Sequence, residues 1–150
     1  MNLFKKEQED VKVIRPPTLG WLEKKLSEKE LDYLWRCIDN RKESFKHNLA
    51  GQIHESNTLV DRGDWFWINT IKPLCKEYYQ EFGNLGSNIP VNQNHPYILN
   101  SFWVNYQKQG EFNPLHDHGG VYSFVIWMKI PTKHFEQNKN PISLKSNTHV

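Results

Sequence analysis

The stretch that decides the fold runs from residue 97 to residue 131 and reads YILNSFWVNYQKQGEFNPLHDHGGVYSFVIWMKIP. Its two ends, residues 97–106 and 121–130, are rich in aromatic and β-branched side chains, which favour strands. The fourteen residues between them contain three glycines and a proline, a composition typical of a long loop. We therefore expect two strands joined by a loop whose tip can hold a functional site.

Upstream of this stretch the pattern is mainly helical. Residues 11–14, VKVI, alternate enough to predict one short strand, which Pro16 and Pro17 end because proline has no backbone N–H donor. The segment SEKE at residues 27–30 is a capping box, and apolar residues recur after it at helical spacing. A helix is therefore expected from this box to about residue 44.

A second helix is expected from about residue 64 to residue 82, with Gly83 as its C-terminal cap. Pro73 lies inside this range, and an interior proline removes one helical hydrogen bond. The helix is therefore expected either to kink near Asn69 or to begin closer to Pro73. Residues 48–60, before it, mix turn formers with apolar residues and predict a loop with room for one short strand.

The chain has the length of one domain, so residues 1–150 are expected to fold as a single α+β unit. Its mainly helical part covers residues 1–96, and its strand-rich part covers residues 97–150. Turn-forming residues from Asn84 to Pro96 mark the boundary between the two parts.

Composition and charge argue against several classes of function. The 19 Lys and Arg and 17 Asp and Glu are scattered, so no binding surface for nucleic acid is expected. The N-terminus has no apolar signal core and no apolar run approaches the roughly 20 residues that cross a bilayer, so no membrane association is expected. Cys37 and Cys75 offer neither a disulfide framework nor paired zinc-ligand spacing, which favours a reduced, cytoplasmic setting.

Two histidines flank an aspartate in the long loop. On an extended backbone, side chains two positions apart point the same way, so His116 and His118 would converge while Asp117 points away. Such a pair suits zinc, copper, nickel or ferrous iron when a third ligand arrives from elsewhere. The alternative is a polar loop in which the histidines bond backbone or water and Asp117 caps a turn. The spacing by itself leaves both interpretations open.

The wider pattern is an aromatic strand ending in WVNY at residues 103–106, then Gly110, FNPLHDH at residues 112–118 and YSFVIWMKIP at residues 122–131. This order resembles that of the 2-oxoglutarate- and Fe(II)-dependent oxygenases, and in particular a branch from phages and marine bacteria that has His-x-His where prolyl-hydroxylase relatives have His-x-Asp. The resemblance implies N-terminal helices packed on a double-stranded β-helix, or jelly roll. It also implies Fe(II) and 2-oxoglutarate as cofactors, with decarboxylation of 2-oxoglutarate coupled to substrate hydroxylation.

The resemblance implies roles for individual side chains. His116 matches the first histidine ligand, and His118 stands where many relatives have a carboxylate, unless Asp117 takes that role. Tyr106 matches a tyrosine that often contacts 2-oxoglutarate, and Trp127 stands near the place where relatives commonly have another tyrosine. Both aromatic residues also suit ordinary packing in a core, and that alternative stays open.

The sequence departs from the family after the loop. The family's distal histidine and its 2-oxoglutarate-binding arginine come from later strands, yet only His134 and His149 follow His118, and no arginine follows Arg62. About four strands are predicted where a jelly roll needs about eight. An incomplete jelly roll is therefore expected, completed by a longer product or by a partner chain. Its open sheet edges favour a homo-oligomer.

Three functions fit this pattern. The first is a 2-oxoglutarate- and Fe(II)-dependent oxygenase, inactive unless the missing residues are supplied. The second is a non-catalytic phage structural or binding module that keeps the scaffold. The third is a cupin-like metal-binding protein that uses His116 and His118 without 2-oxoglutarate. A third metal ligand and an arginine for the co-substrate would discriminate among them, and the substrate is not indicated by the sequence.

Overall fold

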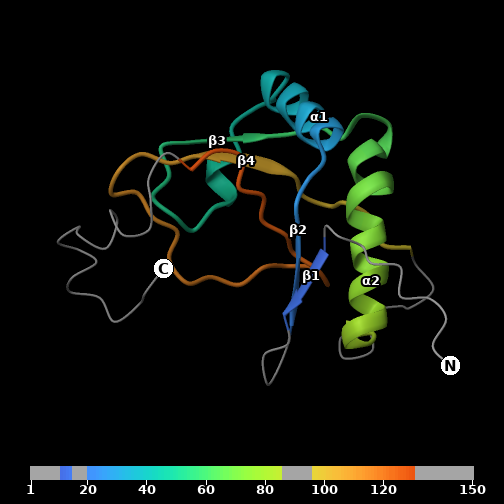
Figure 1. Cartoon of the computed structure of the whole chain (residues 1–150). Coiled ribbons are helices and arrows are strands. Elements are labelled where there is room, and N and C mark those ends of the chain that lie inside the picture. The colour runs from blue at the N-terminus through green and yellow to red at the C-terminus, as the bar shows by residue number, and fades with distance from the viewer. Residues whose placement is uncertain (1–10, 15–19, 86–95, 131–150) are drawn as a thin grey trace, which may run out of the picture.

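Two α-helices and two small antiparallel sheets form the regular structure of the described residues, so this part of the chain is α+β (Figure 1). The computed structural model describes residues 11–14, 20–85 and 96–130. The strands and α-helices, in chain order, are β1 (Val11–Ile14), β2 (Trp21–Lys24), α1 (Glu28–Asp39), β3 (Glu55–Thr58), α2 (Lys72–Phe82) and β4 (Trp103–Tyr106).

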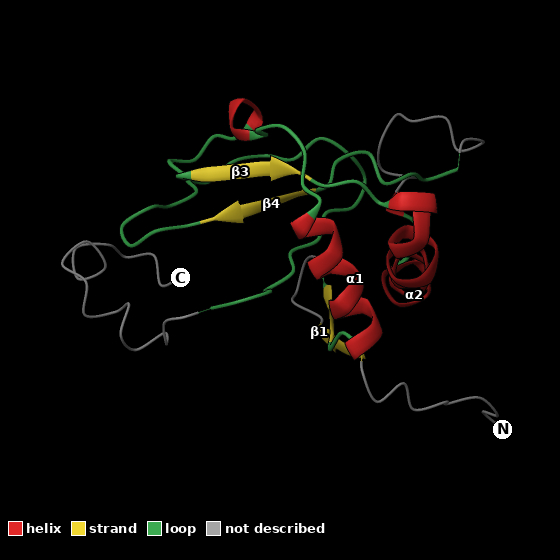
Figure 2. Ribbon diagram, turned by 90° about the horizontal axis from the view of Figure 1, so that it is seen from above, coloured by secondary structure: helices red, strands yellow, loops and turns green. Residues whose placement is uncertain are grey.

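Each sheet lies beside one helix. The β1–β2 hairpin runs alongside α2, and β3 and β4 lie side by side next to α1 (Figures 1 and 2). The Tyr78 hydroxyl of α2 donates a hydrogen bond to the Gly20 carbonyl at 3.0 Å, just before β2 begins. On the other side, Leu59 and Val104 pack with Cys37 of α1. Some apolar side chains of the described residues are thus buried between helices and sheets.

The first hairpin confirms one predicted strand and adds one that was not predicted. Val11 of β1 lies opposite Lys24 of β2, and Ile14 lies opposite Trp21. The strand predicted at residues 11–14 is therefore confirmed, whereas the prolines predicted to end it lie outside the described residues. β2, WLEK, was missed because half of it consists of Glu23 and Lys24, residue types that are depleted in strands, and because its pairing with β1 is a tertiary contact.

Helix α1 begins as predicted and ends earlier than predicted. The Glu30 backbone N–H donates to the Ser27 side-chain oxygen at 3.3 Å, and the Ser27 N–H donates to the Glu30 carboxylate at 2.8 Å, which confirms the capping box. The helix stops at Asp39 instead of near residue 44. The reason is tertiary, because the Lys42 N–H donates to the Thr58 carbonyl at 2.8 Å and draws the chain towards β3.

The second sheet is shorter than the sequence pattern indicates. β3 lies within residues 48–60, where room for one strand was expected, and it pairs Glu55 with Tyr106 and Thr58 with Trp103 of β4. β4 covers only the end of the strand predicted at residues 97–106. One further bond, from the Leu59 N–H to the Phe102 carbonyl at 2.9 Å, extends the pairing beyond β4.

The second helix accommodates its proline through a π-helical turn, η3 (Trp67–Ile71), which comes directly before α2. At this junction the Lys72 N–H donates to the carbonyl of Trp67, five residues back. Pro73 then occupies the first turn of α2, where its missing N–H costs little. Gly83 caps the other end as predicted, with φ of 83° and its N–H bonded to the Tyr79 carbonyl at 2.9 Å.

The buried carboxylate of Glu30 joins three parts of the fold. Its Oε1 atom accepts from Lys24 Nζ and from Thr70 Oγ1, each at 2.6 Å, and its Oε2 atom accepts from Ser27. Burial would raise the pKa of Glu30, but these donors outweigh it and lower the pKa from 4.5 to about 2. The ionised Glu30 therefore ties β2 and η3 to the start of α1.

Phe66 is the centre of the core and is 0% exposed. Its ring centroid lies 5.9 Å from that of Phe102 and 6.5 Å from that of Phe124, so three distant segments meet there. Two clusters of buried side chains form the core of the described residues. The first core cluster consists of Leu34, Phe66 and Ile71. The second core cluster consists of Cys37, Ile38 and Leu59.

Residues 121–130 do not form the predicted strand, although their side chains alternate as those of a strand do. The segment runs from near the β1–β2 hairpin towards β4 and carries no ladder to any other described residue (Figure 1). Ile126 and Met128 pack on the core clusters, whereas Val125 and Trp127 are 73% and 74% exposed. The prediction was wrong because aromatic and β-branched composition only favours a strand, while a strand also requires a hydrogen-bonded neighbour.

The jelly roll predicted for this chain remains a prediction, because the described strands form two separate two-stranded sheets. Histidines 134 and 149 lie outside the described residues, as does Pro131, which was expected to end the last strand. None of the helices in the described ranges combines the length and apolar character needed to cross a bilayer.

Candidate metal-binding loop

The loop after β4, residues 107–120, is anchored to the segment before β3. The Gln52 N–H donates to the Phe112 carbonyl at 3.1 Å. Glu111 Oε2 accepts from the backbone N–H groups of His54 at 2.8 Å and Lys108 at 2.9 Å. The Lys108 N–H, together with that of His54, lowers the pKa of Glu111, so this carboxylate stays ionised as an anchor.

A glycine permits this close approach. A Cβ atom added to Gly51 would lie 2.0 Å from the Asn113 side-chain oxygen and 2.9 Å from the Phe112 carbonyl oxygen. Any larger residue at position 51 would therefore push the loop outwards. The loop that carries the histidines is thus held at its base by local contacts with residues far away in the sequence.

His116 and His118 come together at the exposed tip of this loop. Their ring centroids are 4.6 Å apart, and the ring planes are inclined by 51°. His116 Nδ1 lies 2.7 Å from the Pro114 carbonyl oxygen. A carbonyl can only accept, so Nδ1 is the donor here, and in the neutral imidazole Nε2 has the lone pair that a metal would use.

The spacing of the two rings suits coordination of a single metal ion. Two imidazoles bound through nitrogen at about 2.1 Å have ring centroids on the order of 4.5 to 5 Å apart when their bonds meet near a right angle. The Pro114 carbonyl orients His116 in the way that a hydrogen bond to the second nitrogen commonly orients a metal-bound histidine. The two imidazole rings therefore lie close together, and their joint binding of a metal remains a prediction.

A complete metal centre is not assembled within residues 11–14, 20–85 and 96–130. No group of three or more His, Cys, Asp or Glu side chains in these ranges is arranged to hold a metal. Asp117 is exposed, like the two histidines beside it. The described residues thus place two histidines side by side, with no third candidate ligand grouped with them in these ranges.

Tyr106 is partly buried and packs against the second core cluster, which is formed by Cys37, Ile38 and Leu59. The Arg41 guanidinium covers its ring at 5.6 Å from the centroid, and Arg41 Nε also lies 3.6 Å from a Glu55 carboxylate oxygen. The sequence pattern did not single out Arg41, because it precedes β3 and only the fold brings it to β4. Trp127, the other aromatic residue assigned to the co-substrate, is largely exposed.

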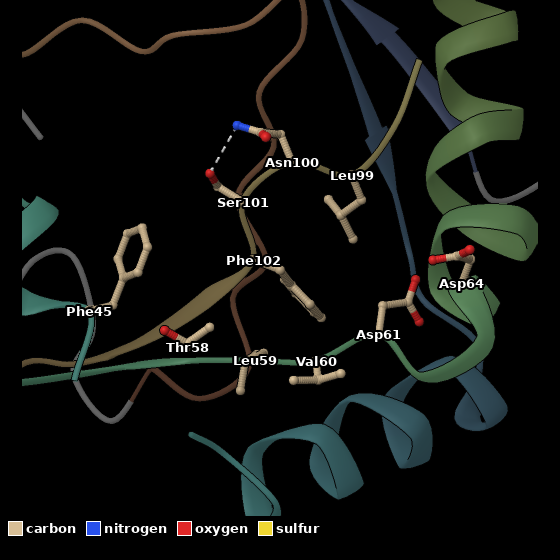
Figure 3. Close-up of a pocket in the computed structure, with 10 residues that line it drawn as sticks. All are labelled: Phe45, Thr58, Leu59, Val60, Asp61, Asp64, Leu99, Asn100, Ser101 and Phe102. Carbon is tan, nitrogen blue, oxygen red and sulfur yellow. Dashed lines mark hydrogen bonds between the residues drawn. The ribbon is translucent and has the colours of Figure 1, made fainter. Parts of the chain in front are cut away.

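A separate hollow of about 270 Å³ opens between residues 58–61, at and after the end of β3, and residues 99–102, just before β4, and none of its lining residues comes from the loop (Figure 3). Asp61, one of the acidic residues that line this hollow, already accepts hydrogen bonds within the fold. Asp61 accepts from the Phe66 N–H at 2.9 Å, from the Trp67 N–H at 2.8 Å and from the Tyr33 hydroxyl at 2.5 Å. These contacts cap the helical segment that leads into η3.

Comparison with family models, curated proteins and solved structures found no match for this chain. The functional argument therefore rests on the geometry of the loop and on the pattern of the sequence.

Proposed function

We propose that this chain is a metal-binding protein of the 2-oxoglutarate- and Fe(II)-dependent oxygenase type, whose loop supplies His116 and His118 to the metal. The observation that carries the proposal is the pair of imidazole rings 4.6 Å apart, one of them oriented by the Pro114 carbonyl. The sequence from WVNY to YSFVIWMKIP, which resembles that family, supports ferrous iron over other divalent ions.

The proposed fold is a jelly roll built on β3, β4 and residues 121–130. In support, residues 121–130 turn alternate side chains to the same core that β4 covers, as a further strand of the roll would. The remaining strands and the third metal ligand would come from residues outside the described ranges or from another chain. Bound iron would supply the oxidative chemistry, and the side chains of this protein would bind and orient it.

Other residues have proposed roles in the same site. Asp117 is the candidate carboxylate ligand if His118 does not bind. Tyr106 is the candidate contact for 2-oxoglutarate, and the Arg41 guanidinium over its ring is a candidate cation for a co-substrate carboxylate. Trp127 is the candidate aromatic cover, because its indole is exposed and able to pack against a bound molecule.

Anaerobic calorimetric titration of Fe(II) into the whole chain, with and without 2-oxoglutarate, tests the proposal. We expect binding that 2-oxoglutarate tightens and that His116→Ala or His118→Ala weakens by about tenfold or more. His47→Ala, which removes an exposed histidine from the short helix η1 (Lys46–Asn48), is the matched control and should bind as the unmodified chain does. Iron binding that survives both loop substitutions would refute the proposal.

Two alternatives give different results in the same titration. A cupin-like protein would bind a divalent metal through His116 and His118, and 2-oxoglutarate would have no effect. A non-catalytic binding module, which the exposed Val125 and Trp127 side chains favour, would bind no iron at all.

A further inference from the structure

The hollow between residues 58–61 and residues 99–102 has two walls that are fixed to each other (Figure 3). The Leu59 N–H donates to the Phe102 carbonyl at 2.9 Å, and this bond joins the walls. The Phe102 ring is stacked on the buried Phe66 ring, with centroids 5.9 Å apart and planes inclined by 5°. The hollow is therefore formed before a ligand arrives, as small-molecule sites usually are.

One end of the hollow is acidic. Asp61 and Asp64 lie at the same end, whereas Phe45 lies at the other (Figure 3). The Asp64 N–H donates to the Asp61 carbonyl at 3.2 Å, which keeps both residues in one tight turn. None of the described residues that line the hollow is basic, and neither carboxylate forms an ion pair with a described residue. The hollow therefore has a negative potential that attracts cations and repels anions.

The two carboxylates have hydrogen-bonding capacity to spare. An ionised carboxylate can accept about four hydrogen bonds. Asp61 accepts bonds from the Phe66 N–H, the Trp67 N–H and the Tyr33 hydroxyl, and these donors hold its carboxylate in place. The Asp64 side chain is exposed and accepts no bond from the described residues. An ammonium group, which carries three N–H donors, matches these acceptors.

The sides of the hollow are apolar. They are lined by Leu59, Val60, Leu99 and Phe102. The volume of about 270 Å³ is just below the range of about 300 to 1,000 Å³ that is usual for pockets of drug-sized ligands. A ligand that fills this hollow is therefore small, and its body is apolar.

We propose that the hollow binds a small organic cation, with its ammonium group at Asp61 and Asp64 and a short apolar chain between the two walls. A metal ion alone would leave the apolar walls without a contact, and a neutral molecule would leave both charges without a counter-ion. The site is separate from the His116–His118 tip, because none of its described lining residues comes from the loop. Its test is therefore independent of iron binding.

Nuclear magnetic resonance titration of the whole chain with n-pentylamine, which is ionised at about pH 7, tests the proposal. We expect saturable shifts of the backbone N–H signals of Asn100, Ser101 and Phe102. Methylamine, which lacks the apolar chain, and n-pentanol, which lacks the charge, should each bind about tenfold more weakly or less. Pentanoate has the same chain with a negative charge and should not bind.

Substitutions separate the two halves of the site. Asp64→Asn should weaken pentylamine binding by about tenfold, and Asp32→Asn, at an exposed aspartate of α1, is the matched control that should bind as the unmodified chain does. Leu99→Ala should weaken the binding of pentylamine and leave that of methylamine unchanged. The proposal would be overturned by the absence of saturable binding, by equal affinities for pentylamine and pentanol, or by equal affinities of the Asp64→Asn and Asp32→Asn variants.

Discussion

Replacement of Glu30 by glutamine should remove a pH-dependent part of the stability of this protein. The Glu30 carboxylate is 6% exposed and accepts hydrogen bonds from Lys24, Thr70 and Ser27. A glutamine has nearly the same shape but no charge, so Lys24 loses its ionic partner. The substitution therefore tests whether the charge at this position, rather than its packing, ties β2 and η3 to α1.

The expected loss of unfolding free energy follows from the pKa of Glu30. Lowering this pKa from 4.5 to about 2 corresponds to about 3 kcal/mol of unfolding free energy, at about 1.4 kcal/mol for each pH unit. Because the pKa is lower in the folded state, this stabilisation is fully present above about pH 4.5. It is lost as the pH falls from there towards about 2, where the folded state also takes up the proton.

Urea unfolding at a series of pH values measures the effect. At neutral pH the Glu30→Gln variant should be about 3 kcal/mol less stable than the unmodified chain, and this gap should close between about pH 4.5 and pH 2. Glu43→Gln, at an exposed glutamate, is the control, and its unfolding free energy should depend on pH in the same way as that of the unmodified chain. A gap for Glu30→Gln that stays constant with pH would refute the reasoning, because the loss would then come from packing alone.

Two further substitutions test the anchoring of the loop and the helix cap. Gly51→Ala should place a Cβ against Asn113 and the Phe112 carbonyl, destabilise the protein by about 1 to 3 kcal/mol and weaken Fe(II) binding. Denaturant unfolding and calorimetry measure both effects, and an unchanged metal affinity would show that the anchor does not position the histidines. Asp61→Ala should remove the acceptor for the Phe66 and Trp67 N–H groups and cost about 1 to 2 kcal/mol in urea unfolding, whereas an unchanged midpoint would contradict its role as a cap.

Interactions between residues close in the sequence were predictable from the sequence alone. The capping box of Ser27 and Glu30 and the cap at Gly83 each depend on only a few neighbouring residues, and both are present. The closeness of the His116 and His118 rings likewise agrees with their two-residue spacing. Local backbone geometry is sufficient for each of these features, which is why a short motif predicts them.

Features that depend on distant residues were decided by the tertiary structure. The sequence showed that residues 121–130 are rich in strand-forming side chains, but only the fold shows which of them face the core and that no described strand pairs with them. The fold likewise places Lys24 and Thr70 against Glu30, and Arg41 over the ring of Tyr106. A strand ladder, a buried ion pair and a cation over a ring all require two segments to meet in space. The pattern within either segment alone does not contain that information.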